Sequence, residues 1–428
     1  MREDLYGLVK SYIDKCNHCG DCRAVCPVFA QEPVETAVAR GKLILADRVL
    51  AGEIEPSPTL LERFDKCLLC ESCTYQCAFH LRVDRVVMAT RAVIAEAIGL
   101  PVAKKVVFDL IANHQSTLGL VCAAGSITSP LWGKRVPQDS GLNLRFPMPG
   151  LSGDRLLPRP AARSFRSRAP EFRPAEGAKM TVAFFTGCYI NHVAPSVGMD
   201  TLSLLNRAGV SVRIPRDQQC CGTPMAASGD LDTALRLMRN NLTALSAAQP
   251  DAVVAACATC GTALRDLYPQ LLAKLDPSLE KAARELAART YDISEFLTDV
   301  VPLPAPPALE KPLRVTYHDS CHLRRGLSIQ AQPRRLLQGV GNVDFVEMEN
   351  ADVCCGGAGA FSFTQQRLSR AILARKTNGI VATSADIVVS GCHGCNLQIS
   401  EGLATAQAPI RTLHTVQLLE MAYRAERK

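Results

Sequence analysis

Eight of the nineteen cysteines in this 428-residue chain form two short runs with identical spacing. Both runs read Cys-x2-Cys-x2-Cys-x3-Cys, and the first is followed by Pro27. Their members are Cys16, Cys19, Cys22 and Cys26, then Cys67, Cys70, Cys73 and Cys77. Such spacing places several soft thiolates on one tight loop, whereas structural zinc usually takes two separated Cys-x2-Cys pairs. The runs therefore favour iron and inorganic sulfide over a mononuclear zinc site.

This spacing is typical of bacterial ferredoxins with two [4Fe–4S] clusters, in which the fourth cysteine of each run binds the cluster of the other run. We therefore expect two [4Fe–4S] clusters. The first would be bound by Cys16, Cys19, Cys22 and Cys77. The second would be bound by Cys67, Cys70, Cys73 and Cys26. Ala78 stands where the first run has its proline, but that position binds no iron.

Ten further cysteines form a pattern that occurs twice: one cysteine, then Cys-Cys-Gly, then Cys-x2-Cys. The first copy contains Cys188, Cys220, Cys221, Cys257 and Cys260, and the second contains Cys321, Cys354, Cys355, Cys392 and Cys395. Matching cysteines are 133 to 135 residues apart, which indicates two sister domains rather than a solenoid. The adjacent pair suits a bridging thiolate or two metals in one body. Gly222, Gly356 and Gly357 are expected to let the backbone approach a cluster closely.

The elements around these cysteines predict two α/β domains with parallel sheets. β-like runs at 182–185 and 313–317 lead into the first cysteine of each copy, and amphipathic helices are predicted at 231–247 and 365–376. Since functional groups in such sheets lie beyond the carboxyl ends of the strands, the cysteines of each copy should meet at one rim. The first block instead predicts a mostly α-helical domain, with helices near 34–51 and 84–98.

The expected organisation has four parts: an α-helical domain with two [4Fe–4S] motifs at 1–115, a connecting segment at 116–179, and two cysteine-rich domains at 180–305 and 306–428. Prolines and arginines crowd the stretch 147–179, which predicts a solvated linker, or alternatively a contact with anionic lipid or an acidic partner. The prolines are Pro147, Pro149, Pro158, Pro160, Pro170 and Pro174. The arginines are Arg155, Arg159, Arg163, Arg166, Arg168 and Arg173.

The repeated pattern resembles the cysteine-rich "CCG" domain of heterodisulfide reductase catalytic subunits. The same domain occurs in the iron–sulfur subunits of glycolate oxidase, lactate-utilisation proteins and anaerobic glycerol-3-phosphate dehydrogenase. Eighteen of the nineteen cysteines fall on these motifs, and a dicluster domain followed by two CCG domains is similar to the glycolate oxidase iron–sulfur subunit. The resemblance implies that the five cysteines of a copy can hold a further, non-cubane iron–sulfur cluster. It also implies an FAD-containing dehydrogenase subunit as partner and quinone, or an equivalent carrier, as electron acceptor.

The sequence carries neither a Gly-x-Gly-x-x-Gly fingerprint after a strand nor a phosphate-binding loop, so flavin or NAD is not expected on this chain. The net charge of +7 is small for this length and does not favour nucleic acid as a partner. The apolar stretch 102–123 is interrupted by charged and polar residues, and the first residues lack the pattern of a secretory signal. We expect a cytoplasmic protein that is peripheral on the cytoplasmic face of the inner membrane.

Three alternatives remain open at this point. One is a heterodisulfide reductase-like catalytic subunit, and another is an electron-transfer protein like the iron–sulfur subunit of glycerol-3-phosphate dehydrogenase; the third is a zinc protein that binds nucleic acid. Outside the motifs, Cys122 is expected to be a buried thiol rather than a ligand. Three histidines flank the second-copy cysteines, where they could hydrogen-bond to cluster sulfurs, carry protons or serve local packing. They are His318, His322 and His393.

Overall fold

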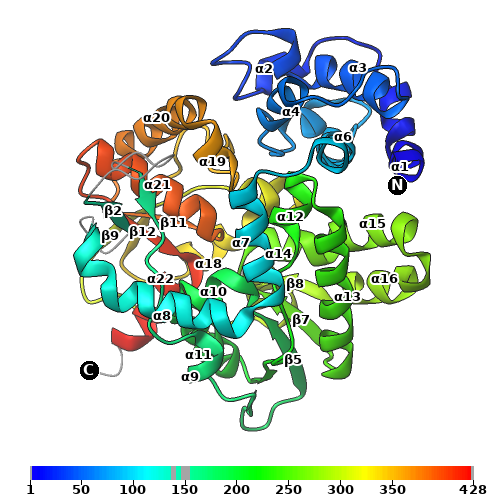
Figure 1. Cartoon of the computed structure of the whole chain (residues 1–428). Helices are drawn as coiled ribbons and strands as arrows, with labels where there is room; N and C mark the ends of the chain where they lie inside the picture. Colours follow the sequence, from blue (N-terminus) through cyan, green and yellow to red (C-terminus); the bar gives the residue numbers. More distant parts are fainter. Residues whose placement is uncertain (1, 136–140, 146–154, 426–428) are drawn as a thin grey trace.

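The computed structural model describes residues 2–135, 141–145 and 155–425, so Pro147 and Pro149 of the predicted linker lie outside the described residues. The N-terminal domain is α-helical, as predicted, and it occupies the upper right of Figure 1. Its helices are α1 (Arg2–Asp14), α2 (Cys22–Val25), α3 (Ala39–Leu50), α4 (Pro58–Asp65), α5 (Ser72–Gln76) and α6 (Val83–Ile98). Helix α6 is buried on nearly all sides from Val83 to Ala95, because α1, α3 and α4 cover it within the domain and α12 (Thr223–Ser228) covers it from outside.

Two consecutive helices leave this domain and run along the outside of the molecule: α7 (Val102–Asn113) and α8 (Gln115–Trp132) (Figure 1). Helix α8 contains no charged residue, yet Ser129 is its only buried side chain. A small antiparallel sheet follows, in the order β1 (Gly133–Arg135), β2 (Leu142–Leu144) and β3 (Leu156–Leu157). Among the described residues no single helix is long and apolar enough to cross a membrane; α6 and α7 reach that length only as a pair, bent by 111°.

The first cysteine-rich domain is built on a five-stranded sheet in the order β4-β6-β5-β7-β8. Neighbouring strands are parallel except for β4, which pairs antiparallel with β6. The strands are β4 (Phe172–Arg173), β5 (Met180–Phe185), β6 (Val210–Arg213), β7 (Ala252–Ala255) and β8 (Thr290–Asp292). The helices are α9 (Phe165–Arg168), α10 (Gly187–His192), α11 (Pro195–Arg207), α12, α13 (Leu231–Ala247), α14 (Ala258–Thr262), α15 (Tyr268–Leu275), α16 (Glu280–Ala288) and α17 (Ile293–Glu295).

The second cysteine-rich domain repeats this plan with a four-stranded parallel sheet in the order β10-β9-β11-β12. Its strands are β9 (Leu313–Tyr317), β10 (Val343–Phe345), β11 (Ile387–Ser390) and β12 (Arg411–His414). Its helices are α18 (Ala331–Gln338), α19 (Phe361–Thr364), α20 (Gln366–Ala382), α21 (His393–Thr405) and α22 (Thr415–Ala425). Helix α22 packs against α11 of the first copy, and apolar side chains of both copies share one core.

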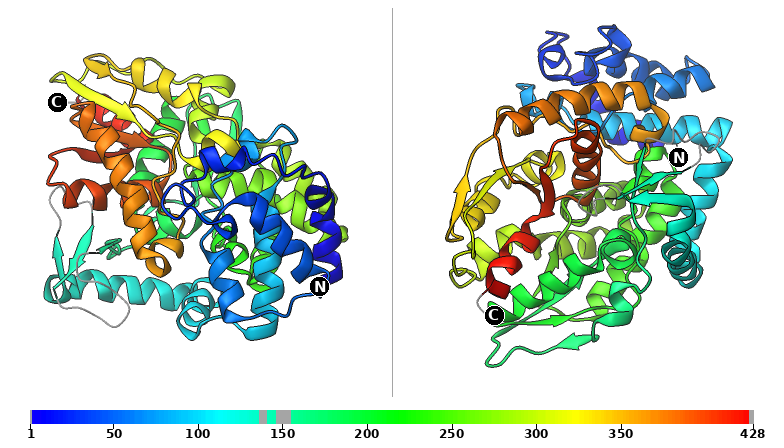
Figure 2. Two further views of the ribbon diagram at one scale, coloured as in Figure 1. Left: turned by 90° about the horizontal axis from the view of Figure 1, so that it is seen from above. Right: turned by 90° about the vertical axis from the view of Figure 1, so that its left-hand side faces the viewer.

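The cysteines that follow the strands lie at one rim of each sheet, as the β-α-β pattern predicts. Cys188 and Cys257 come just after β5 and β7, and Cys321 and Cys392 come just after β9 and β11. Parallel strands end at the same edge, so each pair is brought together by the topology alone. Figure 2 shows from two sides that the N-terminal domain lies against both cysteine-rich domains.

The described part of the predicted linker differs from a solvated chain. Strand β4 belongs to the first sheet, and Arg155 is 1% exposed. Its Nη1 donates a hydrogen bond to Oε1 of Glu401 in α21 (2.9 Å), and Arg166 donates to the carbonyl oxygens of Arg216 and Gln218. These two arginines are therefore occupied within the protein and are not free to bind lipid. The bounds of the four parts themselves stay predictions.

Candidate metal centres

The two N-terminal cysteine loops have the same unusual backbone. In each loop the second and fourth residues after the first cysteine have positive φ: His18 (57°) and Gly20 (92°), then Leu69 (53°) and Glu71 (58°). A left-handed conformation costs free energy for non-glycine residues, and it persists where the surroundings require it. Both loops therefore have the same curvature, each around its own centre, although their intervening residues differ. This is the backbone that a cluster held by closely spaced thiolates requires.

Four cysteines line one cavity, and they are the four predicted for the second [4Fe–4S] cluster: Cys26, Cys67, Cys70 and Cys73. The void, including its mouth, is about 440 Å³. Burial raises the pKa of Cys26 to about 12 and raises the pKa values of Cys67 and Cys73, so these thiols keep their protons unless a metal displaces them. Three donors from one run and one from the other fit a cubane shared between the runs.

The other predicted set is brought together through its helices. Burial is the main cause that raises the pKa of Cys22, and the neighbouring thiols of Cys16 and Cys19 add to it. Cys77 directly follows α5, which packs against α2, and it shares an apolar cluster with Cys16 and Cys22. The packing of α5 against α2 thus brings the two runs side by side, and the assignment of Cys77 to the first cluster stays a prediction.

The five cysteines of the first copy form a continuous series of sulfur contacts in the order 188, 220, 221, 260 and 257. The Sγ atoms of Cys188 and Cys220 are 3.7 Å apart. Hydrogen bonds from Cys220 and then Cys260 lower the pKa of Cys221 well below its usual value. Cys260 in turn contacts Cys257. A buried thiol in contact with two sulfurs, within a series of five, is a donor set for soft iron rather than for a hard cation.

The second copy repeats this series in the order 321, 354, 355, 395 and 392. The thiol of Cys354 contacts Cys321 and Cys355. Hydrogen bonds from Cys354 and then Cys395 lower the pKa of Cys355 well below its usual value. Cys395 also lowers the pKa of Cys392 to about 7. The matching order of contacts shows that the duplication seen in the sequence extends to the geometry of the two sites.

The cavity of the N-terminal domain and the second-copy site meet at a pair of cysteines. A hydrogen bond with Cys354 is the main cause that lowers the pKa of Cys70 to about 6. Around this contact, Cys26 and Cys70 pack in one apolar cluster with Cys321, Cys354 and Phe361. Thus Cys70, a predicted ligand of the second [4Fe–4S] cluster, contacts Cys354, a predicted ligand of the second cysteine-rich site. These two residues are 284 positions apart in the sequence. Sequence reasoning assigned both cysteines but had no signal for their contact.

The two cysteine-rich sites also face each other, through side chains next to their cysteines. The ring of Tyr189, beside Cys188, stacks on His393, beside Cys392, with centroids 5.0 Å apart. His393 stacks in turn on His414, also at 5.0 Å. At the other crossing, Thr259 Oγ1 lies 2.9 Å from Nδ1 of His322. His322 and His393 therefore sit between the copies, a role that their position beside cysteines did not reveal.

Lys42 is a cavity-lining residue that sequence reasoning missed. Its side chain is 2% exposed, and its Nζ donates hydrogen bonds to the carbonyl oxygens of Thr36 (2.6 Å) and Arg63 (2.8 Å). Burial lowers the pKa of Lys42 to about 8, so it remains mainly cationic at pH 7. A buried ammonium group beside four cysteines would compensate the negative charge of an iron–thiolate cluster held by them. A single lysine in an amphipathic helix does not indicate, from sequence alone, that its side chain is buried beside a cysteine cavity.

Cys122 is less buried than expected, and the glycines of the Cys-Cys-Gly motifs have a role in the backbone and packing of the fold. Cys122 is only partly buried, and the nearby Cys188 adds to the burial that raises its pKa. Gly222 (φ +81°) and Gly356 (φ +82°) have left-handed backbones that favour glycine. A Cβ on Gly356 would lie 2.8 Å from the carbonyl oxygen of Ser369, so its lack of a side chain is required by packing against α20. Packing against this helix therefore requires the glycine.

Comparison with known families agrees with these sites. Residues 182–265 and 315–400 match the family model of the CCG cysteine-rich domain, and residues 12–98 match that of the 4Fe-4S dicluster domain. The dicluster match implies [4Fe–4S] clusters in the N-terminal domain. The two CCG matches cover the two sets of five cysteines and, of the two sheets, most of β5 and β9 and all of β6, β7, β10 and β11.

Individual relatives extend this likeness over the whole chain. A Bacillus subtilis (strain 168) protein named "Probable glycolate oxidase iron-sulfur subunit" is 31% identical over 420 residues, covering 94% of this chain and 92% of the relative. Lactate utilization protein A of Oceanobacillus iheyensis is 34% identical over 56% of this chain and 96% of its own length. A subunit of the CoM/CoB fumarate reductase of Methanothermobacter marburgensis is 34% identical over 56% of this chain and 46% of its own length. Since the first likeness spans both the dicluster domain and the paired cysteine-rich domains, the chain belongs to the family of glycolate oxidase iron–sulfur subunits.

Proposed function

We propose that this chain is the electron-transfer subunit of a flavin-dependent 2-hydroxy-acid dehydrogenase of glycolate or lactate type. Iron–sulfur clusters accept and release one electron at a time, so the two-electron oxidation of the substrate is assigned to a separate FAD-containing subunit. The observation that carries the proposal is the contact between Cys70 and Cys354, which joins the dicluster domain to the cysteine-rich domains. The electron acceptor at the far end is quinone or an equivalent carrier.

The protein's own contribution is to hold the centres close together and to keep water away. Cys70, Cys354 and Cys355 are buried or largely buried, and the apolar side chains of Val28, Phe361 and Leu368 pack around the contact. Short separations in a dry interior favour rapid electron transfer. The facing rims of the two CCG domains extend this arrangement to the first copy.

Attachment to a membrane is proposed through α7 and α8. Val102, Leu120, Ile127 and Leu131 are each more than 70% exposed, which is unusual for so many large apolar side chains on two consecutive helices. Leu120, Ile127 and Leu131 recur at intervals of seven and four residues, so they share one face of α8. We propose that this face lies in the membrane interface on the cytoplasmic side, close to a lipid-soluble acceptor.

A second function is favoured by one specific observation. Both copies retain all five cysteines in the same contact order, and a relative is named as a subunit of a CoM/CoB fumarate reductase. A heterodisulfide reductase-like role, in which a CCG centre itself cleaves a disulfide, is therefore the alternative. In that case a purified complex supplied with an artificial one-electron donor would reduce a disulfide to two thiols, taking two electrons from the donor and two protons from water, without needing a 2-hydroxy acid.

Replacing Cys19 by serine tests the relay. The purified complex should lose one cubane signal in electron paramagnetic resonance and lose quinone reduction by at least tenfold. The rate of hydroxy-acid oxidation with an artificial acceptor that oxidises the flavin directly should stay within twofold of the wild-type rate, because the flavin lies on the partner. Cys122→Ser is the matched control, since this thiol lies outside the motifs, and it should retain both activities. Full quinone reduction in Cys19→Ser would refute the relay.

A further inference from the structure

His318 stands out because it is fully buried and lacks an ordinary partner. The residue follows β9 directly, and its backbone N–H donates to the carbonyl oxygen of Val389 in β11 (2.9 Å). Its exposed fraction is 0%, and neither Nδ1 nor Nε2 has a hydrogen-bond partner of ordinary geometry among the described residues; the imidazole interacts only with the thiol of Cys355, whose pKa it helps to lower. Buried polar nitrogens are normally satisfied, and leaving one unpaired costs roughly 1–3 kcal/mol. Burying this imidazole therefore costs free energy, and we expect a bound partner to offset that cost.

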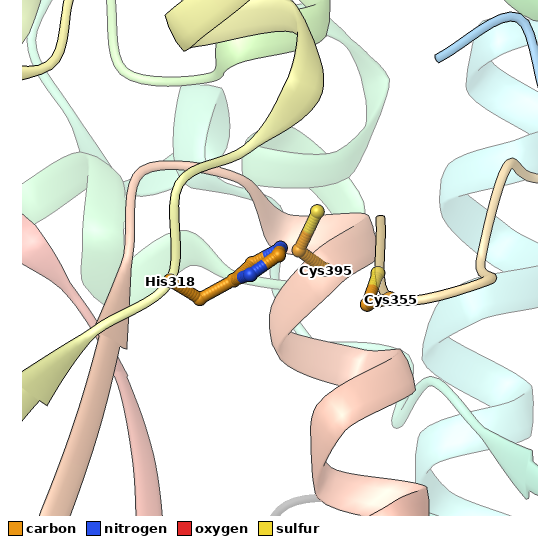
Figure 3. Close-up of side chains that lie close together, drawn as sticks. All are labelled: His318, Cys355 and Cys395. Atoms are coloured by element: carbon orange, nitrogen blue, oxygen red, sulfur yellow. The ribbon is translucent and has the colours of Figure 1, made fainter. Parts of the chain in front are cut away.

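The imidazole points toward two cysteines of the second copy. Its nitrogen and the Sγ atoms of Cys355 and Cys395 all lie within 4.8 Å of one another. Figure 3 shows the ring directed toward Cys395, which is on α21, with Cys355 on a loop beyond it. Three elements distant in sequence thus converge on one point from different sides. An imidazole nitrogen together with thiolates is a common donor set for iron and zinc.

The first copy supplies an internal comparison, because its strands have the same register. Phe185 pairs with Ala255, two residues before Cys257. In the second sheet Tyr317 pairs with Val389, so one step further along His318 faces Ser390, two residues before Cys392. Phe185 therefore occupies the position of His318; it is fully buried and packs in an apolar cluster with Cys221 and Cys260 of its own copy. The corresponding place beside the cysteines is apolar in one copy and a potential ligand in the other.

We propose that the second cysteine-rich site binds its metal through the imidazole of His318 in place of one of its thiolates, whereas the first site uses thiolates alone. This inference rests on the proposal that the cysteine-rich sites hold iron–sulfur clusters. Replacing thiolate by neutral imidazole ligation raises the reduction potential of iron–sulfur centres. The second site would then be the more oxidising of the pair, next to the Cys70 contact through which electrons enter.

The test is pulsed electron paramagnetic resonance on the complex assembled with its own clusters, with and without ¹⁵N-labelled histidine. The wild type should show hyperfine coupling from a directly bound histidine nitrogen, and Cys221→Ser should keep it, because that change disrupts only the first site. His318→Phe should lose this coupling and lower the potential of the second centre. His393→Phe is the control and should keep the coupling, since that ring stacks between Tyr189 and His414.

A substitution in the opposite direction tests whether misfolding explains the loss of the histidine coupling in His318→Phe. Phe185→His should add a histidine coupling at the first site without removing iron. A wild type with the full iron content of the second site but no bound histidine nitrogen, or a coupling that persists in His318→Phe, would overturn the inference and leave the relay intact. Zinc in place of iron, released on replacing His318, would support the ligand assignment and contradict the relay. A second site free of any metal would overturn both.

Discussion

At the scale of single residues, a buried charge beside a predicted cluster is expected to change the reduction potential of that cluster. Lys42 is the clearest case, because its ammonium group is held by two carbonyl oxygens and has no carboxylate among its hydrogen-bond partners. Its positive charge is therefore available to the four cysteines of the adjacent cavity. A nearby cation favours the more negative, reduced state of a cluster, so it should raise the reduction potential.

Lys42→Met should accordingly lower the midpoint potential of one cubane, on the order of 50 mV at pH 7 for a buried charge in a medium of intermediate dielectric constant. Burial lowers the pKa of Lys42, whereas the negative charge of a bound cluster opposes that shift, so the difference from wild type should persist at pH 8. A redox titration monitored by electron paramagnetic resonance measures both effects. The exposed Lys274 provides the control, and Lys274→Met should leave the potential unchanged. Equal potentials for wild type and Lys42→Met at pH 7 would rule out this role.

The residue scale also shows what the sequence could and could not predict. Ligand sets could be assigned because the spacing of cysteines along a loop fixes which thiolates can share a cluster. Contacts such as Cys70 with Cys354, or Arg155 with Glu401, join positions more than 240 residues apart and depend on how whole domains pack. Local pattern carries no information on such packing, so the order of the centres became visible only in the structure.

At the scale of elements, α6 connects the cluster loops to the first cysteine-rich domain. Arg82 and Arg85, at its start, both bind the carboxylate of Asp266, which lies in a π-helical turn after α14. Further along α6, Arg91 donates hydrogen bonds to the carbonyl oxygens of Ala227 and Cys67. The helix thereby fixes the second cluster loop and the first copy to one another.

Asp266→Ala should loosen this connection, because two arginines lose a shared, partly buried carboxylate at a cost of roughly 3 kcal/mol. Hydrogen exchange of α6 should rise by about a hundredfold, while the iron content stays unchanged. Glu280→Ala is the matched control, since it removes an exposed ion pair with Arg284 that contributes less than about 0.5 kcal/mol. Unchanged exchange in Asp266→Ala would mean that apolar packing of α6 against α12 suffices.

Elements also differed in how well they could be predicted. The strand Leu313–Tyr317 and the helix Leu231–Ala247 have the predicted bounds, since a clear apolar period marks both. The helix predicted at 365–376 extends to Ala382, because Ile380 is buried and continues the apolar face. Strand β4 was not predicted: it is two residues long, lies among prolines, and exists only because the edge of β6 offers it partners.

At the scale of the whole molecule, the cysteine sites lie inside while one long apolar surface lies outside. The side chains of Leu120, Ile127 and Leu131 share an exposed face of α8, and Val102 on α7 is likewise exposed, which a protein in free solution would not favour. The position of this apolar surface on α7 and α8, which run along the outside of the molecule, suits contact with a flat partner such as a bilayer (Figure 1).

The double change Leu120→Glu and Ile127→Glu should therefore reduce membrane binding. Burying a Leu or Ile side chain contributes about 1.5–3 kcal/mol, so losing two should weaken binding to vesicles of phosphatidylethanolamine and phosphatidylglycerol at least a hundredfold. Co-sedimentation of the assembled complex measures this, and iron content should not change because neither side chain is buried. Ile44→Glu with Val381→Glu is the matched control, since these exposed apolar residues lie on other elements. Vesicle binding that survives the α8 changes, with loss of the flavin subunit on gel filtration instead, would assign this surface to the partner protein.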